Sequence, residues 1–225
     1  MDPFDIVQLG SLGVFLATFV AGTVAVWRRT ERCPLRLRPW NGTGDPAAPL
    51  LFFTTNLWVA ELLREALLSG WQPLPRILTV HLLTWLPVRL AGAGLTAVGL
   101  AIFALSVREL GEFWRLGIDS HAPSRLVTTG IYGVSRNPIY LFFNLYLFGA
   151  FAMHGTLVLL LFALVMAALL HWQTLIEERV LLRAHTAAYI SYRSRVPRYL
   201  ASVSLWREVW RRLTAFAGAL VRSAG

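Results

Sequence analysis

A short polar segment, GIYGVSRNPIY at positions 130–140, carries side chains that could hold an anion. Asparagine is a favoured N-cap residue and proline is tolerated at the first helical position, so Asn137 and Pro138 predict the start of a helix. An exposed helix N-terminus beside an arginine, here Arg136, suits a carboxylate or a phosphate. The simpler alternative is that Arg136 only reaches toward lipid headgroups.

Two adjacent acids, Glu177 and Glu178, follow later in the segment QTLIEERVLL. We expect them to close a helix at its C-terminus, where negative charge opposes the helix dipole. A charge placed unfavourably against the helix dipole often marks a functional site. Pairing of the acids with Arg179 or Arg183 would explain their position equally well. Carboxylates suit an ammonium group or the hydroxyls of a sugar. Together with Arg136, the acids predict a polar pocket.

Aromatic side chains accompany both segments. Tyr140 lies one turn into the first predicted helix, on the same face as Asn137. Tyr189, Tyr192 and Arg193 share one helix face, which could stack an adenine ring or lie in the headgroup layer. No second histidine stands at metal-ligand spacing from the histidine at 171, and the chain has a single cysteine. The sequence therefore predicts no metal site.

Long apolar segments must position these side chains. The chain of 225 residues is 56% hydrophobic and only 15% charged, and several apolar runs approach the ~20 residues that span a bilayer. We therefore expect an all-α integral membrane protein rather than a soluble one. About five transmembrane helices are predicted, at Ile6–Trp27, Leu50–Leu68, from about Leu86 to Val107, Pro138–Met153 and Thr156–Ile176.

The distribution of arginine predicts the orientation. All 21 basic residues are arginine, and eighteen of them lie in the loops at 28–38 and 108–136 and in the tail after residue 178. Five spans place these regions on one side, which the positive-inside rule makes the cytoplasm, so we expect an N-out, C-in protein. The arginines flank apolar spans, which favours anionic lipid over nucleic acid as their partner.

The predicted organisation has three parts: transmembrane helices at 1–107, a core at 108–200 that carries the polar pocket, and a tail at 201–225. The tail contains an amphipathic helix at 206–221 that could lie along the headgroups. Close helix packing is expected through the small residues Gly92, Thr96 and Gly99. The charged residues of the second span, Glu61, Arg64 and Glu65, either pair with one another or line a substrate path.

The succession LVTTGIYGVSRNPIY, an apolar hairpin, EERVLL and AAYISYRSRVPRYL resembles the isoprenylcysteine carboxyl methyltransferase family of integral membrane enzymes. The wider superfamily also includes phospholipid N-methyltransferases. The resemblance covers roughly residues 108–200 and implies S-adenosylmethionine bound at the cytoplasmic face. The residues that it implies for the cofactor site are Arg136, Pro138 and Tyr140 of an Arg-His-Pro-x-Tyr element, with Asn137 in place of the His, the acids Glu177 and Glu178, and Tyr189, Tyr192 and Arg193.

Two departures from the family pattern matter. Asn137 replaces a histidine, which removes a titratable group, and Thr186 stands where a glycine is common, so the turn there should differ. Arg136 and Glu178 are the residues to which the resemblance assigns catalysis. The implied reaction is methyl transfer to a lipophilic or small membrane-permeant acceptor bearing a carboxylate, thiol or amine. The implied location is a bacterial inner membrane, with the active site facing the cytoplasm.

Two other functions stay open at this point. A membrane reductase of the sterol reductase type would bind NADPH, and Arg193, Arg195 and Arg198 could then hold the 2′-phosphate. A non-catalytic membrane scaffold would keep the helices and lose the chemistry, and the change at Asn137 would be an early sign of that loss.

Overall fold

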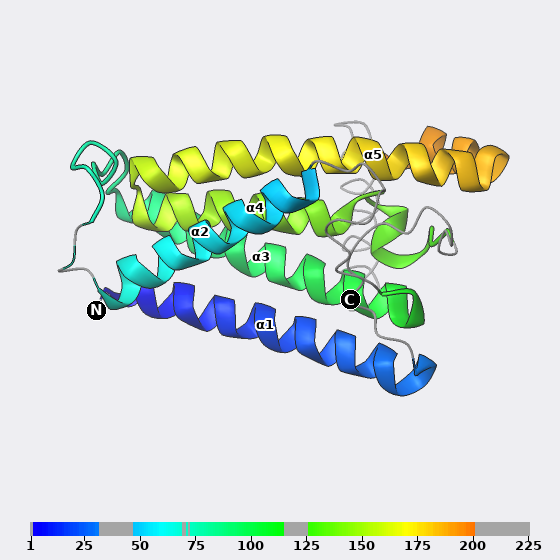
Figure 1. Ribbon diagram of the computed structural model, residues 1–225, viewed down its shortest axis with the longest axis horizontal. Coiled ribbons are helices and arrows are strands. Elements are labelled where there is room, and N and C mark those ends of the chain that lie inside the picture. Colours follow the sequence, from blue (N-terminus) through cyan, green and yellow to red (C-terminus); the bar gives the residue numbers. More distant parts are fainter. Residues whose placement is uncertain (1, 32–46, 69–70, 72, 115–125, 201–225) are drawn as a thin grey trace, which may run out of the picture.

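The computed structural model describes residues 2–31, 47–68, 71, 73–114 and 126–200. Within them five α-helices run lengthwise beside one another (Figure 1), and no residue belongs to a named strand. The helices are α1 (Pro3–Thr30), α2 (Ala47–Leu67), α3 (Leu86–Leu110), α4 (Pro138–His154) and α5 (Leu157–Arg195), with short 3-10 helices η1 (Gly111–Phe113) and η2 (Gly130–Gly133).

The all-α membrane class is confirmed. In the described ranges α1, α3 and α5 are long and apolar enough to cross a membrane, and α4 is a shorter apolar helix of 17 residues. Each predicted span coincides with one helix, but α2 is not among the helices that meet this criterion, so the number of spans and the orientation stay predictions. The tail at 201–225, with its predicted amphipathic helix, and most of the loop at 28–38 lie outside the described residues.

Helices α3 and α4 approach each other through small residues, as the sequence predicts. A Cβ added to Gly92 would lie 2.7 Å from the main-chain oxygen of Gly149 and 2.8 Å from the nitrogen of Met153. The Gly149 position is equally tight, because an added Cβ there would meet the Oγ1 of the buried Thr96. Contact of main chain with main chain fixes α4, and with it the residues at its N-terminus.

The chain between α2 and α3 runs against the turn that joins α4 to α5. Gly155 ends α4 in the left-handed conformation (φ 74°), where glycine is favoured. Its carbonyl oxygen accepts a hydrogen bond from the nitrogen of Leu82 at 2.6 Å, and the nitrogen of Leu157 donates to the oxygen of Val80 at 3.0 Å. The sequence predicts a re-entrant or surface piece up to about Leu86, and residues 77–85 form an irregular segment over this turn before α3 begins at Leu86.

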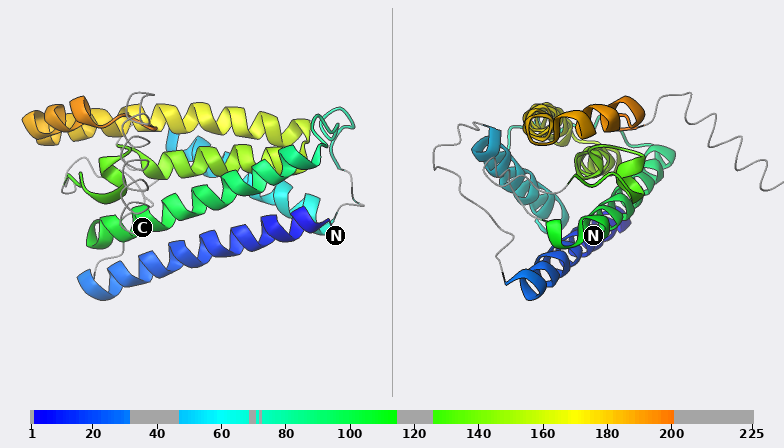
Figure 2. Two further views of the ribbon diagram at one scale, coloured as in Figure 1. Left: turned by 180° about the vertical axis from the view of Figure 1, so that it is seen from behind. Right: turned by 90° about the vertical axis from the view of Figure 1, so that its right-hand side faces the viewer.

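The charged residues of α2 pair with one another. The Arg64 guanidinium lies 2.7 Å from Glu61 and 2.5 Å from Glu65, and both Arg64 and Glu61 are buried. The self-paired interpretation of this cluster is confirmed. The cluster lies at the end of the bundle where α1 begins, away from the end where α4 starts (Figures 1 and 2).

The prediction that Glu177 and Glu178 close a helix was wrong. The first part of α5 continues past both acids to a kink at Thr186, which has non-helical dihedral angles (φ 17°, ψ −91°), and a second helical part leads from there to Arg195. The sequence after the acids is rich in good helix formers and has no proline before Pro197, so nothing ends the helix there. The argument from the helix dipole therefore fails, because both acids lie inside the first helical part of α5 and not at its end. Thr186, where the family pattern has glycine, marks the break.

Candidate functional site

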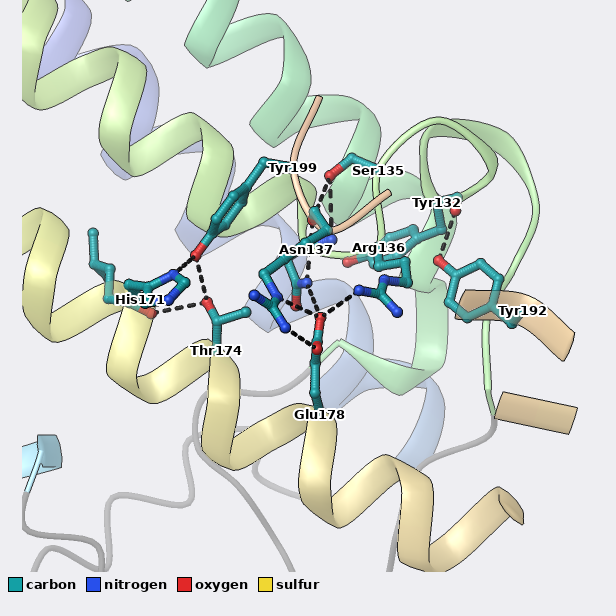
Figure 3. A network of polar contacts seen from close by, with 11 residues as sticks. Tyr132, Ser135, Arg136, Asn137, His171, Thr174, Glu178, Tyr192 and Tyr199 are labelled. Carbon is teal, nitrogen blue, oxygen red and sulfur yellow. Dashed lines mark hydrogen bonds and ion pairs between the residues drawn. The ribbon is translucent and has the colours of Figure 1, made fainter. Parts of the chain in front are cut away.

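The carboxylate of Glu178 is the centre of a polar network at the end of the bundle where α4 begins (Figure 3). Its Oε1 lies 3.2 Å from the Nη2 of Arg136 and accepts a hydrogen bond at 3.0 Å from the side-chain nitrogen of Asn137. Arg198 donates to both oxygens, from Nε at 3.2 Å and from Nη2 at 3.0 Å. The side chains of Glu178 and Arg136 are only 12% and 10% exposed, so these charges interact with little screening by water.

Asn137 links this network to the start of α4. The helix begins at Asn137 and Pro138 as predicted, but the Asn137 side chain makes no capping hydrogen bond. Its Nδ2 instead donates to Glu178 and, at 3.2 Å, to the main-chain oxygen of Arg198. A neutral amide that donates two hydrogen bonds replaces the histidine of the family pattern, and the buried side chain joins three parts of the chain.

The segment after α5 is tied to the start of α4 by its main chain. The nitrogen of Arg136 donates to the oxygen of Pro197 at 3.0 Å, and the nitrogen of Asn137 donates to the oxygen of Arg198 at 3.1 Å. The hydroxyl of Ser135 donates to that same oxygen at 3.2 Å. These bonds hold residues 196–199, which we call the C-terminal strap, across the N-terminus of α4.

The second acid has a different partner. The hydroxyl of Tyr140 donates to the Oε1 of Glu177 at 2.6 Å, which joins α4 to α5 a second time. Adjacent residues on a helix point in directions about 100° apart, so Glu177 and Glu178 face different neighbours. Two carboxylates, two arginines and a tyrosine hydroxyl thus lie within one region of the structure.

The tyrosines of α5 are buried on the far side of Arg136. The Arg136 guanidinium lies 6.0 Å from the centre of the Tyr189 ring, a cation–π distance. The hydroxyl of Tyr192 donates at 2.6 Å to the main-chain oxygen of Tyr132, which fixes η2 against α5. Arg193 is exposed and, among the described residues, contributes no hydrogen bond or ion pair to the network.

A third set of contacts anchors the tip of the strap. The hydroxyl of Tyr199 lies 2.9 Å from the Nδ1 of His171 and donates to the hydroxyl of Thr174 at 3.4 Å. Thr174 is fully buried and donates to the main-chain oxygen of Leu170 within its own helix. Tyr199 therefore holds the strap on α5 on the apolar side of Glu178.

The electrostatics keep these groups in defined charge states. The hydrogen bonds to Glu178 raise the pKa of Arg198 above its ordinary value, so this guanidinium stays protonated. Burial raises the pKa of the Tyr132 phenol, helped by the nearby charge of Glu177. Both effects oppose proton exchange near neutral pH, so the site acts through fixed charges and hydrogen bonds.

Several polar atoms at the site have no partner within the part of the chain that the structure describes. They are the Nε of Arg136, the Oε1 of Gln173 and the hydroxyl of Tyr189, all buried. Buried polar atoms are normally paired, and each exception calls for an explanation such as a functional role. Donors beside carboxylates match the amino-acid end of S-adenosylmethionine, which carries a carboxylate and an ammonium group. The residues present therefore fit this cofactor.

Sequence reasoning assigned no role in the methyltransferase site to Arg198 or Tyr199. The alternative reductase hypothesis groups Arg198 with Arg193 and Arg195, but the structure does not gather these three side chains. Arg195 is exposed and donates to the main-chain oxygen of Ser191, whereas Arg198 turns to Glu178. The sequence feature that could have indicated these roles is Pro197. A proline ends a helix, so Arg198 and Tyr199 can fold back toward the start of α4.

The comparison with protein families gives one match, to the phospholipid methyltransferase model over residues 88–188. No curated protein matches the chain. The matched segment runs from the start of α3 to Ala188, so it contains Arg136, Asn137 and both acids but ends before the strap. This segment is therefore similar to the phospholipid methyltransferase family, the same family of membrane methyltransferases as the isoprenylcysteine carboxyl methyltransferases.

Proposed function

We propose that this protein is an S-adenosylmethionine-dependent methyltransferase that transfers a methyl group to a lipophilic or small membrane-permeant acceptor bearing a carboxylate, thiol or amine. The observation that carries the proposal is the network around Glu178, in which Arg136 and Asn137 from the start of α4 meet an acid of α5. This network lies inside the segment that matches the methyltransferase family. The catalytic core of the proposal spans residues 108–200, between the N-terminal helices at 1–107 and the tail at 201–225.

The cofactor supplies a methyl group on a sulfonium centre, which an acceptor attacks in line. Arg136, with its unpartnered Nε, would hold the carboxylate of the cofactor's amino-acid end. Glu178 or Glu177 would hold its ammonium group or the ribose hydroxyls, and Tyr189 or Tyr192 would pack against adenine. Asn137, Pro138 and Tyr140 set the position of these groups, and Arg193 would contribute charge from the rim.

The chain's own contribution to the reaction is chiefly positioning. Holding two reactants in the reactive geometry can supply a large part of a rate enhancement, because it removes the entropy cost of bringing them together. Helix α5 exposes apolar side chains such as Leu161, Leu164 and Val165, so the bundle presents an apolar surface to the bilayer from which an acceptor would come. We propose that this end of the bundle faces the cytoplasm at a bacterial inner membrane.

Membranes that contain the full chain test this function directly. They are incubated with S-adenosylmethionine labelled in the methyl group, and the lipid, protein and volatile fractions are then counted. We expect label in the lipid fraction, strongly reduced by Glu178→Gln and retained by Arg195→Gln, which changes an exposed arginine. Absence of label from all three fractions would contradict methyl transfer and would favour a scaffold.

A further inference from the structure

Two guanidinium groups share the carboxylate of Glu178, so at this one carboxylate the cations outnumber the anion. Arg136 approaches from the start of α4 at 3.2 Å, and Arg198 makes a two-point contact from the strap at 3.2 and 3.0 Å. One acid can neutralise only one of these cations. The neighbouring acid, Glu177, is engaged by the hydroxyl of Tyr140. The position around Glu178 therefore suits a ligand that brings a negative charge of its own.

The two arginines differ in accessibility. The Arg136 side chain is 10% exposed, whereas that of Arg198 is 35% exposed. The buried Nε of Arg136 has no partner in the described parts of the chain. A ligand that enters from the side of the strap would thus meet Arg198 first and would find an unused donor behind it.

The main chain holds Arg198 in place independently of its side chain. Its carbonyl oxygen accepts hydrogen bonds from the nitrogen of Asn137 at 3.1 Å and from the hydroxyl of Ser135 at 3.2 Å. Tyr199, the next residue, is anchored on His171. A side-chain change at position 198 would leave these anchors intact, so the guanidinium can change its partner while the strap stays closed.

We propose that Arg198 is a further cofactor-binding residue, which together with Arg136 forms a two-arginine clamp for the carboxylate of the cofactor's amino-acid end. Glu178 lies between the two arginines and is placed to pair with the ammonium group of the same ligand. The inference rests on the proposed function and extends it to a residue outside the family match, which ends at residue 188. A planar guanidinium that can bind a carboxylate through two hydrogen bonds gives both affinity and orientation.

Binding of two probes to the full chain in neutral detergent tests the clamp. S-adenosylhomocysteine carries the amino-acid end, whereas 5′-methylthioadenosine has the same adenine and ribose without it. We expect Arg198→Gln to weaken S-adenosylhomocysteine by about 10- to 100-fold, the range for a hydrogen bond to a charged group, and to leave 5′-methylthioadenosine unchanged. Arg198→Lys should weaken S-adenosylhomocysteine binding less than Arg198→Gln does, because lysine keeps the charge but loses the two-point contact. Arg195→Gln, the matched control, should change neither affinity.

The other outcomes each decide against the clamp. If Arg198→Gln leaves the ratio of the two affinities unchanged, Arg198 does not bind the carboxylate of the cofactor. A lipid phosphate then becomes the anion to test. If it weakens both probes equally, Arg198 supports the fold of the site as a whole. If the wild-type chain binds neither probe, the proposed function fails together with the clamp, a result distinct from an unchanged ratio.

Discussion

At the scale of single residues, Glu178 organises the site because three residues distant in sequence direct donors at its carboxylate. Arg136 and Asn137 come from the start of α4 and Arg198 from the strap. Removing the negative charge would leave two arginines close together with no counter-charge between them. Leaving a half-buried cation without its partner lowers the stability of the fold more than losing an exposed ion pair does.

Glu178→Gln should therefore destabilise the protein more than the adjacent change Glu177→Gln. We expect a loss of about 1–3 kcal/mol in the free energy of unfolding for Glu178→Gln, the cost of leaving buried polar groups unpaired. Glu177→Gln keeps an acceptor for the hydroxyl of Tyr140 and should cost less. Denaturant unfolding of both variants in the same detergent measures the difference, and equal losses would argue against a central role for Glu178.

Asn137 should control how firmly the strap is held. Asn137→Ala removes the hydrogen bonds from Nδ2 to Glu178 and to the oxygen of Arg198 but keeps the main-chain bond. We expect a loss of about 1 kcal/mol, which corresponds to roughly fivefold faster tryptic cleavage after Arg195 or Arg198 when strap opening precedes cleavage. Asn144→Ala is the matched control, because within the described residues Asn144 donates to the main-chain oxygen of Tyr140 in its own helix. Identical cleavage rates for the two variants would contradict this role.

At the scale of the elements, the apolar helices were predictable and the course of α5 was not. Hydrophobic length predicts the long apolar helices α1, α3 and α5, and the small residues of α3 predict its contact with α4, because both signals are local. The continuation of α5 past Glu178 follows from good helix formers and the lack of a proline before Pro197, and the argument from the helix dipole concealed it. The role of Arg198 could not be read from the sequence, because its partner Glu178 lies 20 residues earlier and the contact needs the chain to fold back.

The contact between α3 and α4 can be tested with two glycines of the same helix. Gly92→Ala should destabilise the protein by about 1–3 kcal/mol, because the new methyl group would press on the main chain of α4. Gly94→Ala meets nothing within 4 Å and should leave stability unchanged or raise it, since alanine favours a helix. Thermal unfolding of both variants gives the comparison. Equal midpoints would show that α3 and α4 are not in close contact.

At the scale of the whole molecule, the two ends of the bundle carry different chemistry. The end at which α1 starts holds the self-paired Arg64 cluster, and the opposite end holds the Glu178 network (Figures 1 and 2). The arginine distribution predicts that the Glu178 end faces the cytoplasm. The contacts within the site could not be derived from that distribution, because charge counts orient a membrane protein without specifying which side chains meet.

Cysteine labelling in sealed inverted and right-side-out vesicles tests the orientation. In a Cys33→Ser background, Ser194→Cys reports on the Glu178 end and His81→Cys on the opposite end, and both positions are exposed. We expect a membrane-impermeant maleimide to label position 194 only in inverted vesicles and position 81 only in right-side-out ones. The reverse pattern would place the site outside the cell.

Equilibrium binding of S-adenosylmethionine to the purified full chain, followed by calorimetry, tests the central claim most directly. The account predicts saturable binding at one site, weakened about 10- to 100-fold by Arg136→Gln because a charged hydrogen bond to the carboxylate is lost. A wild-type chain that binds no S-adenosylmethionine, or an Arg136→Gln variant that binds it as tightly as the wild type, would contradict the assignment of the Glu178 network as the cofactor site.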